Sequence, residues 1–368
     1  MSSGLITRID AFEAILPLPK TLVLGQMVIP HREYSFVRLY DDAGNIGTGF
    51  ALSRNAPVSA TFLRAIAPFW QAKPLDEHEM LYERAVKSNV ALGTNGVFWR
   101  ALSLGDCALY DLRAQRAGQP LAEFLGGQVK NTTTMLVGGY PMPDETSATL
   151  AAEMRAMSAY RPAGVKIGSS SDYAKDTRRL AAGREALPEG TPLMIDLHWN
   201  APNAEAVLAH AREWDRFNMG WIEDPFGFDD FENIARLADG LSFPVAVGDE
   251  QSGVRHFRRL MDDGHIGVVR LDATVCGGVR AFMTIAALAA ERGLSVASHV
   301  YHHVHTQLAS VVPNVQWVEY FLPTSGLDSI DLVWNRDLEW ADGGLVTATE
   351  PGMGYHWNEA ALERYRRT

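Results

Sequence analysis

The chain has 368 residues, 47% of them hydrophobic and 21% charged, which is typical of a folded soluble protein. Its formal net charge of −11 disfavours nucleic acid and anionic membrane as partners, and a negatively charged substrate would need a locally positive site such as a bound cation. The two cysteines, Cys107 and Cys276, lack metal-ligand spacing and fit a reducing cytoplasm. We expect no signal peptide and no membrane span, because neither kind of apolar run is present.

Residues 1 to about 130 predict a small mixed domain. Alternating apolar and polar residues over Leu5–Leu16 and Tyr34–Tyr40, and again over Ile46–Ala51 after a turn at 41–44, predict an antiparallel meander. Apolar residues then recur at three- and four-residue spacing, which predicts helices. The helical stretches are Val58–Trp70, Asp76–Lys87 and Gly96–Ala117.

After Lys130 the pattern changes to short apolar strands, each followed by a helical stretch. Such alternation implies parallel pairing, and a set of eight strands favours a closed barrel over an open sheet. We therefore predict an α/β fold of the barrel type, followed by a tail that packs back on the N-terminal domain. The eight strand candidates are Thr133–Val137, Gly164–Ile167, Leu193–Leu197, Gly220–Ile222, Val245–Val247, Gly267–Leu271, Leu294–Ala297 and Val315–Glu319.

Ionisable residues follow or end nearly every barrel strand after the first. Because the active sites of such barrels lie at the carboxyl ends of the strands, we expect these side chains to meet at one opening. In chain order they are Lys166, Asp196, Glu223, Asp249 with Glu250, Asp272, His299 and Glu319.

Three of these residues, Asp196, Glu223 and Asp249, are acidic and come from successive strands. Three converging carboxylates repel one another unless a cation neutralises them, and oxygen ligands select a hard cation such as Mg²⁺. Any one of them alone could instead form a salt bridge at the rim. Because all three lie at the carboxyl ends of successive strands, we favour a magnesium site over three separate salt bridges.

Lys166 and His299 are predicted on opposite sides of this acidic centre, and either could accept a proton. Asp272, one strand before His299, could orient the imidazole ring. Glu319 could stabilise a developing oxyanion. The structural alternatives are a surface charge for Lys166, a core histidine for His299 and a salt bridge for Glu319.

The order and spacing of these segments resemble the mandelate racemase and muconate lactonizing enzyme family of the enolase superfamily, and its mandelate racemase branch in particular. The resemblance covers nearly the whole chain. It rests on a linker-like region and on motifs at the strand ends, namely Ser103–Leu112, Gly118–Leu121, Leu125–Gly127, Val165–Gly168, Met194–Asp196, Trp221–Pro225, Gly248–Glu250, Arg270–Ala273, Gly277–Val279, Ser298–His299 and Trp317–Glu319.

This resemblance implies a modified (β/α)7β TIM-type barrel over residues 131–325. It also implies an N-terminal α+β capping domain over 1–130 and a C-terminal segment over 326–368 that packs on the capping domain. Two capping loops, near Thr21–His31 and Gly47–Asn55, would close over the substrate. Family members form oligomers, so a homo-oligomer is expected.

The resemblance also implies a Mg²⁺ ion and a catalytic set. The third ligand could be Asp249 or Glu250. We favour Asp249 as the ligand. Glu250 would then not contact the metal but would stabilise the position of Asp249 and pair with a basic residue. His198, two residues after Asp196, resembles a histidine that protonates the leaving hydroxyl in some sugar-acid dehydratases, but it could equally be a polar residue of the rim.

The expected reaction is abstraction of the α-proton of a carboxylate substrate through an enediolate, followed by dehydration of a sugar acid to a 2-keto-3-deoxy acid. One departure from the family pattern is Gly164, which stands where many members have the first lysine of a Lys-x-Lys motif. The absence of this lysine, which in the family often helps to neutralise the substrate carboxylate, counts against simple racemisation of a mandelate-like acid. Two alternatives stay open: a racemase or epimerase of a 2-hydroxy acid, in which Lys166 and His299 exchange the proton from opposite faces, and a non-catalytic binding protein on the same fold.

Overall fold

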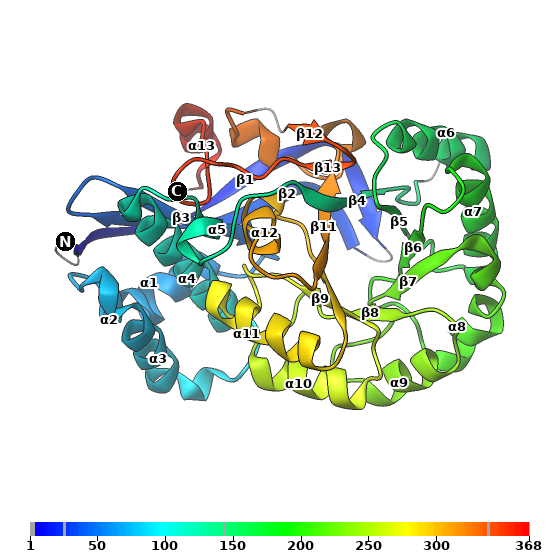
Figure 1. Ribbon diagram of the computed structural model, residues 1–368, viewed down its shortest axis with the longest axis horizontal. Helices are drawn as coiled ribbons and strands as arrows, with labels where there is room; N and C mark the ends of the chain where they lie inside the picture. Colours follow the sequence, from blue (N-terminus) through cyan, green and yellow to red (C-terminus); the bar gives the residue numbers. More distant parts are fainter. Residues whose placement is uncertain (1–3, 25–26, 143–144, 337–338, 368) are drawn as a thin grey trace.

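The computed structural model describes residues 4–24, 27–142, 145–336 and 339–367. Its central element is a closed barrel of parallel strands in sequence order, in which β11 pairs back with β4 (Figure 1). This confirms the predicted barrel, and the ends of the strands differ from the predicted ends by at most two residues. The strands are β4 (Thr132–Gly138), β5 (Gly164–Gly168), β6 (Leu193–Asp196), β7 (Met219–Glu223), β8 (Val245–Val247), β9 (Val268–Leu271), β10 (Ser295–Ser298) and β11 (Val315–Phe321).

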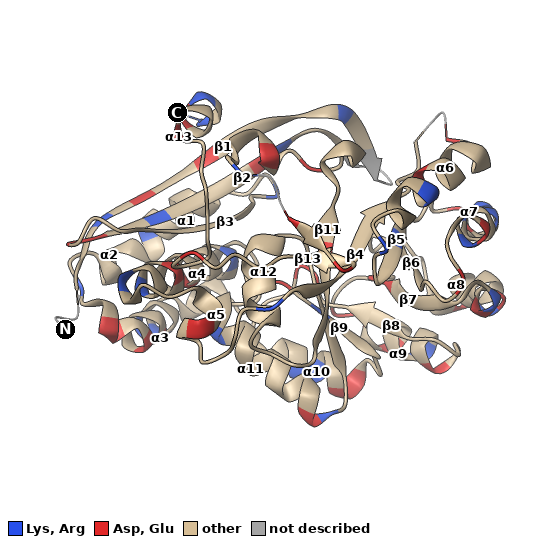
Figure 2. Cartoon of the chain, turned by 45° about the horizontal axis from the view of Figure 1, so that its top comes forward, with Lys and Arg blue, Asp and Glu red and all other residues tan. Residues whose placement is uncertain are grey.

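Helices surround the barrel on its outside (Figure 1). In the view of Figure 2, basic and acidic residues alternate along the ribbons of these outer helices, α7 and α10 among them. No helix of the described ranges is both long and apolar enough to cross a membrane. The helices after the barrel begins are α6 (Ser147–Ser158), α7 (Tyr173–Ala186), α8 (Ala204–Ala211), α9 (Phe231–Asp239), α10 (Val254–Asp263), α11 (Gly278–Glu291) and α12 (His302–Ala309).

The interior of the barrel holds an apolar layer below its open end. Met194, Trp221 and Val268 belong to this layer, with Met135, Ala246 and Ala297, and Trp317 packs against it. Side chains two residues apart on a strand point to the same face. The residues two positions further along three of these strands are Asp196, Glu223 and Arg270. The pleat therefore stacks a charged layer directly on the apolar one.

A separate three-stranded antiparallel sheet, in the order β1-β2-β3, lies before the barrel in the chain and confirms the predicted meander. Its strands are β1 (Ile6–Leu24), β2 (Met27–Asp41) and β3 (Ile46–Leu52). Helices α1 and α4 pack on this sheet. The helices that follow it in the chain are α1 (Val58–Ala65), α2 (Ala67–Trp70), α3 (His78–Ser88), α4 (Val97–Ala117) and α5 (Leu121–Phe124). Short 3-10 helices are η1 (Leu75–Glu77), η2 (Val90–Leu92), η3 (Trp214–Phe217), η4 (Pro323–Ser325) and η5 (Ile330–Val333).

Prolines explain two differences from the predicted elements. The helix expected over Val58–Trp70 is broken into α1 and α2, because Pro68 lies in the first turn of α2, where no donor N–H is needed. Strand β1 continues beyond Leu16 to Leu24 although it contains prolines. Its pairing with β2 shifts register between Pro17 and Leu22, and such a bulge tolerates residues that cannot donate to the ladder.

The β1–β2 hairpin reaches from the capping helices to the open end of the barrel near β4 (Figure 1). Leu18 and Leu22 of β1 form a buried cluster with Leu327, against which Tyr140 and Phe321 pack. The predicted covering loop at Thr21–His31 is thus the end of this hairpin, except that residues 25–26 lie outside the described ranges. The second covering segment, Gly47–Asn55, consists of most of β3 and the turn after it.

The C-terminal residues contact both parts of the molecule. Strand β13 (Gly344–Leu345) pairs antiparallel with β4 and forms a hairpin with β12 (Trp340–Ala341), while α13 (Glu359–Tyr365) packs near β1. Sequence reasoning missed this hairpin. Its signal is Asp342-Gly343, whose positive φ values of 51° and 81° suit a tight two-residue turn. The domain limits at 130 and 325 stay a prediction.

Helix α4 connects the sheet with the barrel. The Asp111 carboxylate accepts hydrogen bonds from the backbone N–H groups of Thr48 on β3 (2.9 Å) and of Met353 in the C-terminal segment (2.7 Å). The Ser103 hydroxyl accepts one from the N–H of Gly277 (2.9 Å), just before α11. Strand β3 can approach α4 closely because Gly49 has no side chain: a Cβ there would lie 2.0 Å from the carbonyl oxygen of Leu104.

We expect Gly49→Ala to lower the free energy of unfolding by about 1–3 kcal/mol, because the added methyl group meets helix backbone that cannot move aside. Urea unfolding followed by circular dichroism measures this loss. Gly227→Ala is the matched control, since a Cβ there would meet only Asp229 Oδ1, at 3.9 Å. Equal stability of the two variants would show that the contact between β3 and α4 does not depend on this glycine.

Candidate functional site

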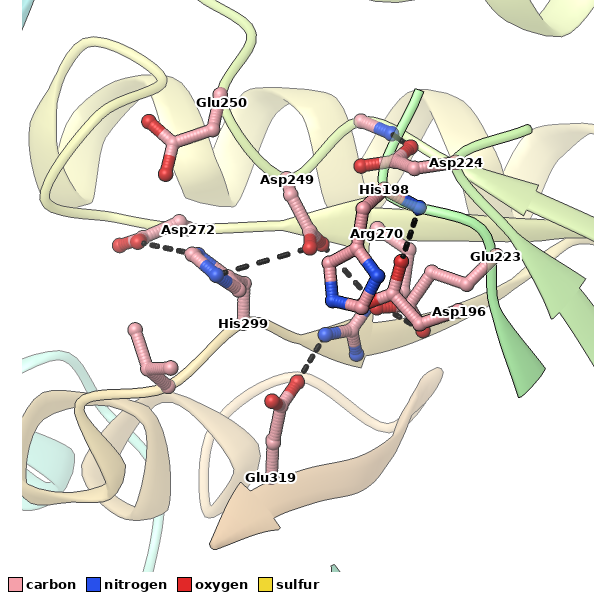
Figure 3. A network of polar contacts seen from close by, with 12 residues as sticks. Asp196, His198, Glu223, Asp224, Asp249, Glu250, Arg270, Asp272, His299 and Glu319 are labelled. Atoms are coloured by element: carbon pink, nitrogen blue, oxygen red, sulfur yellow. Dashed lines mark hydrogen bonds and ion pairs between the residues drawn. The ribbon is translucent and has the colours of Figure 1, made fainter. Parts of the chain in front are cut away.

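Three carboxylates converge at the open end of the barrel. Asp196, Glu223 and Asp249, at the ends of β6, β7 and β8, each place an oxygen within 4.8 Å of the others, and all three side chains are buried. The structure therefore brings together the three residues predicted as metal ligands (Figure 3). Hard oxygen donors in this number suit Mg²⁺, which keeps further positions for water or substrate.

Two cations neutralise these carboxylates in the protein itself. Lys166 Nζ pairs with Glu223 and lies 3.4 Å from both Asp196 Oδ2 and Glu319 Oε2. Arg270 Nε lies 2.9 Å from Asp249 Oδ1 and 3.1 Å from Glu223 Oε2, and its Nη2 pairs with Glu319. The cations are thus interleaved with the acids, which is how buried charges are tolerated.

Sequence reasoning gave Arg270 no role. Its side chain is 0% exposed, and it also donates to the carbonyl oxygen of Ser298 (2.6 Å). The signal was available: an arginine inside an otherwise apolar strand, two positions after the interior residue Val268, must point into the barrel and find acidic partners there.

These charges set the protonation of the carboxylates. Burial raises the pKa of Asp196 to about 7 against the opposing charge of Lys166, and burial likewise raises the pKa of Asp249 to about 7 against Arg270. For Glu223 burial is outweighed by Arg270 and Lys166, which hold its pKa at about 2. Burial would lower the pKa of Lys166, but the charges of Glu223, Glu319 and Asp196 outweigh it and raise that pKa.

His299, which directly follows β10, forms a pair with Asp272. Its Nδ1 lies 3.1 Å from Asp272 Oδ2, and its Nε2 lies 3.6 Å from Asp249 Oδ2 (Figure 3). Thr274 holds the other Asp272 oxygen through its backbone N–H (2.7 Å) and its hydroxyl (2.8 Å). Burial would lower the pKa of His299, but the charges of Asp249 and Asp272 raise it to about 9. The imidazole is therefore charged near neutrality and is fixed in orientation.

His198 and Glu250 lie beside the triad in different ways. The backbone N–H of His198 donates to Asp196 Oδ1 (2.9 Å), while its ring Nε2 lies 3.5 Å from Asp196 Oδ2 and has no hydrogen-bond partner within the described residues. Burial lowers the pKa of His198 to about 4. Glu250 points away from the triad (Figure 3) and pairs instead with Arg54 and Arg100 of the capping region.

Backbone strain accompanies these strand ends. Non-glycine residues with positive φ follow three of the strands: His198 and Trp199 after β6, Asp224 after β7, and Val300 and Tyr301 after β10. Such conformations cost free energy and persist where tertiary structure imposes them, often at active sites. Here they turn the chain sharply, so that His198 and His299 face the same opening.

The opening is a pocket with walls from both parts of the molecule. The strand ends contribute Lys166, Asp196, His198, Asp249, His299 and Glu319. The capping strands and the C-terminal segment contribute Arg32, Leu52, Arg54 and Asp328. Reasoning from sequence did not identify Arg32, Tyr140 or Asp328 as part of this pocket, because their positions depend on contacts between distant segments.

The histidines after His299 lie behind this pocket. His302 and His303 begin α12 with ring centroids 3.8 Å apart, and both line two further cavities. His305 has a structural position: its Nδ1 donates to the carbonyl of Val300 (2.8 Å), and its Nε2 accepts from the N–H of Ala273 (3.0 Å). It thereby ties the segment after β10 to the segment that carries Asp272.

Comparisons with known proteins agree with this architecture. Residues 147–361 match the family described as enolase C-terminal domain-like. The chain is 30% identical over 327 residues to the L-talarate/galactarate dehydratase of Salmonella typhimurium LT2, covering 86% of this chain and 78% of that protein. It is 25% identical over 358 residues to the D-galactarolactone cycloisomerase of Agrobacterium fabrum C58, covering 93% of each.

A solved structure shows the same fold. The L-talarate dehydratase of Polaromonas sp. JS666, complexed with Mg and L-glucarate, superimposes with a TM-score of 0.89 at 25% identity, over 99% of this chain and 98% of that one. The barrel, the ionisable strand ends and the family match lead to one assignment. The chain belongs to the enolase superfamily, as one of its enolase C-terminal domain-like proteins.

Proposed function

We propose that the protein is a Mg²⁺-dependent sugar-acid dehydratase, which removes the proton next to a carboxylate and then eliminates water from the neighbouring carbon to give a 2-keto-3-deoxy acid. The observation that carries this proposal is the buried triad of Asp196, Glu223 and Asp249 flanked by Lys166 and His299. Similarity to the Salmonella dehydratase supports the same reaction class.

Asp196, Glu223 and Asp249 would hold the metal, since they converge and are the oxygen donors that it prefers. Mg²⁺ bound there would act as a Lewis acid on the substrate carboxylate and would disfavour the charged form of Lys166. Glu250 supports this site indirectly, because its pairing with Arg54 and Arg100 fixes the turn that carries Asp249.

The two proton-transferring groups approach the pocket from β5 and β10, on either side of the triad strands. The ion pair of His299 with Asp272 favours a protonated imidazole, which can donate a proton to the departing hydroxyl. Before that step, Lys166 on the other side would remove the α-proton in its neutral form, which a bound Mg²⁺ would favour. Asp272 keeps the imidazole of His299 in the donating orientation.

Glu319 and His198 have supporting roles in this scheme. Glu319 pairs with Arg270 and lies 3.4 Å from Lys166, so it positions both cations at the pocket and lies where an oxyanion could develop. His198 is a poor acid near neutrality because its pKa is lowered to about 4. Its unpaired Nε2 is better suited to hydrogen-bond a substrate hydroxyl than to protonate it.

A racemase or epimerase is the second candidate, favoured by the placement of Lys166 and His299 on two sides of one pocket and by similarity to an isomerase. A non-catalytic binding protein is a remote third. We also propose that the protein is a cytoplasmic homo-oligomer. Each chain would consist of a capping domain (1–130), a barrel (131–325) and a C-terminal segment (326–368), which together bind a small carboxylate substrate.

The identity of the third ligand can be tested with two isosteric variants. Asp249→Asn should weaken Mg²⁺ binding by more than about 100-fold, while Glu250→Gln should weaken it by about tenfold or less, because Glu250 faces two arginines and not the triad. Isothermal titration calorimetry with Mg²⁺ measures both constants. The reverse order of effects would make Glu250 the ligand.

The reaction can be tested by incubating the Mg²⁺-loaded protein with a library of sugar acids and detecting keto acid with semicarbazide. A dehydratase accumulates keto acid, whereas a racemase in D₂O returns deuterated substrate of inverted configuration. A protein that binds no Mg²⁺ and exchanges no deuterium with any acid would be neither enzyme.

The division of roles predicts different defects in two variants. His299→Asn should lower dehydration by a factor of about 10²–10⁴ but still exchange the α-proton with D₂O, whereas Lys166→Met should lose both. His265→Asn is the control, because this exposed histidine pairs with Asp239 away from the pocket. If His299→Asn loses exchange and Lys166→Met retains it, the roles of acid and base are reversed.

A further inference from the structure

Arg32 of β2 is a buried cation on the pocket wall, and it has no acidic partner among the residues that the structure describes. Its side chain lines the same pocket as the triad, and the residue is 9% exposed. Nε and Nη2 both donate to the backbone carbonyl of Leu327, at 3.2 and 2.8 Å. No ion pair and no hydrogen bond involves its Nη1 within the described residues. A guanidinium group buried without a counter-ion is costly unless an anion joins it.

The neighbouring arginines differ in this respect. Arg270 contacts three carboxylates, and Arg54 and Arg100 share the carboxylate of Glu250. Arg32 makes no ion pair with any member of the triad within the described ranges. Its positive charge is therefore available to a group that enters the pocket.

Two other residues define the surroundings of Arg32. Tyr140, which follows β4, lines the pocket, and its hydroxyl has no hydrogen-bond partner among the described residues. Burial raises its pKa, so the phenol stays protonated and can donate. Asp328 also lines the pocket, but its Oδ1 already accepts from the Tyr34 hydroxyl and from the N–H of Ile330 (3.1 Å).

We propose that Arg32, assisted by Tyr140, forms a second carboxylate subsite, so that the substrate is a sugar diacid with one carboxylate at the triad and the other at Arg32. The inference rests on the proposed function for the first carboxylate. A single guanidinium and a phenol match one monoanion, and the nearby negative charge of Asp328 disfavours a doubly charged phosphate. Asp328 is placed to accept a hydrogen bond from a sugar hydroxyl.

The competing explanation is structural: Arg32 would only anchor the β1–β2 hairpin to the C-terminal segment through Leu327. Arg32→Gln separates the two, because glutamine can still donate to the Leu327 carbonyl but carries no charge. Arg32→Lys keeps the charge but loses the double hydrogen bond. Arg64→Gln is the matched control, since Arg64 is an exposed arginine near the end of α1.

The test is calorimetric binding of galactarate and of galactonate, a diacid and a monoacid on one carbon skeleton, to the His299→Asn protein loaded with Mg²⁺. We expect the diacid to bind roughly tenfold more tightly or better. Adding Arg32→Gln should remove that preference with little change for the monoacid, Arg32→Lys should retain part of it, and Arg64→Gln should retain all of it.

Equal affinities in the parent protein, or an equal loss for both acids with Arg32→Gln, would overturn the inference. Circular dichroism shows whether the Arg32→Gln protein folds. If it does not, Tyr140→Phe is the second test. A diacid preference that is unchanged in both Tyr140→Phe and Arg32→Lys would also overturn the proposal. Turnover is measured separately. If the protein prefers the diacid but dehydrates no sugar acid, the proposed reaction is rejected and the subsite is retained. If it dehydrates a sugar acid without preferring the diacid, the reaction is retained and the subsite is rejected.

Discussion

The structure depends on balancing four buried carboxylates against buried cations in one opening of the barrel. Lys166 and Arg270 each contact acids from three different strands, so neither could be satisfied by a single neighbour. Because an unpaired buried charge is far costlier than a paired one, this arrangement fixes the register of the strands as well as the chemistry. A dication arriving at the triad enters a site where cations and anions already alternate, and it takes over part of the neutralisation that lysine and arginine provide.

Much of this could be predicted because it is encoded locally. Each barrel strand is a short apolar run, and its ionisable residue follows at a set position along the pleat, so parallel order alone collects Asp196, Glu223 and Asp249 at one end. The same rule could have placed Arg270, which is two residues beyond an interior valine. Its role becomes clear only when the cation inside an apolar strand is considered together with the acids on neighbouring strands.

The remaining features depend on contacts between distant parts of the chain. The basic partners of Glu250 are Arg54 and Arg100, which are separated from it by 196 and 150 residues. Nothing in a local pattern identifies such pairs. The position of Arg32 likewise depends on how the β1–β2 hairpin crosses the barrel, and the length of that hairpin depends on a bulge at prolines that sequence reasoning took as a strand end.

The two segments that cover the pocket are held in place by different interactions. At the end of β3, the N–H of Leu52 donates to the Tyr301 hydroxyl, and in the following turn Arg54 pairs with Glu250, so polar contacts hold this segment in place. The hairpin packs through Leu18 and Leu22 against Leu327, and its Arg32 also donates two hydrogen bonds to the Leu327 carbonyl. Because Arg32 lines the pocket from this hairpin while the triad belongs to the barrel, any displacement of the hairpin would change the charge of the pocket wall without moving the metal ligands.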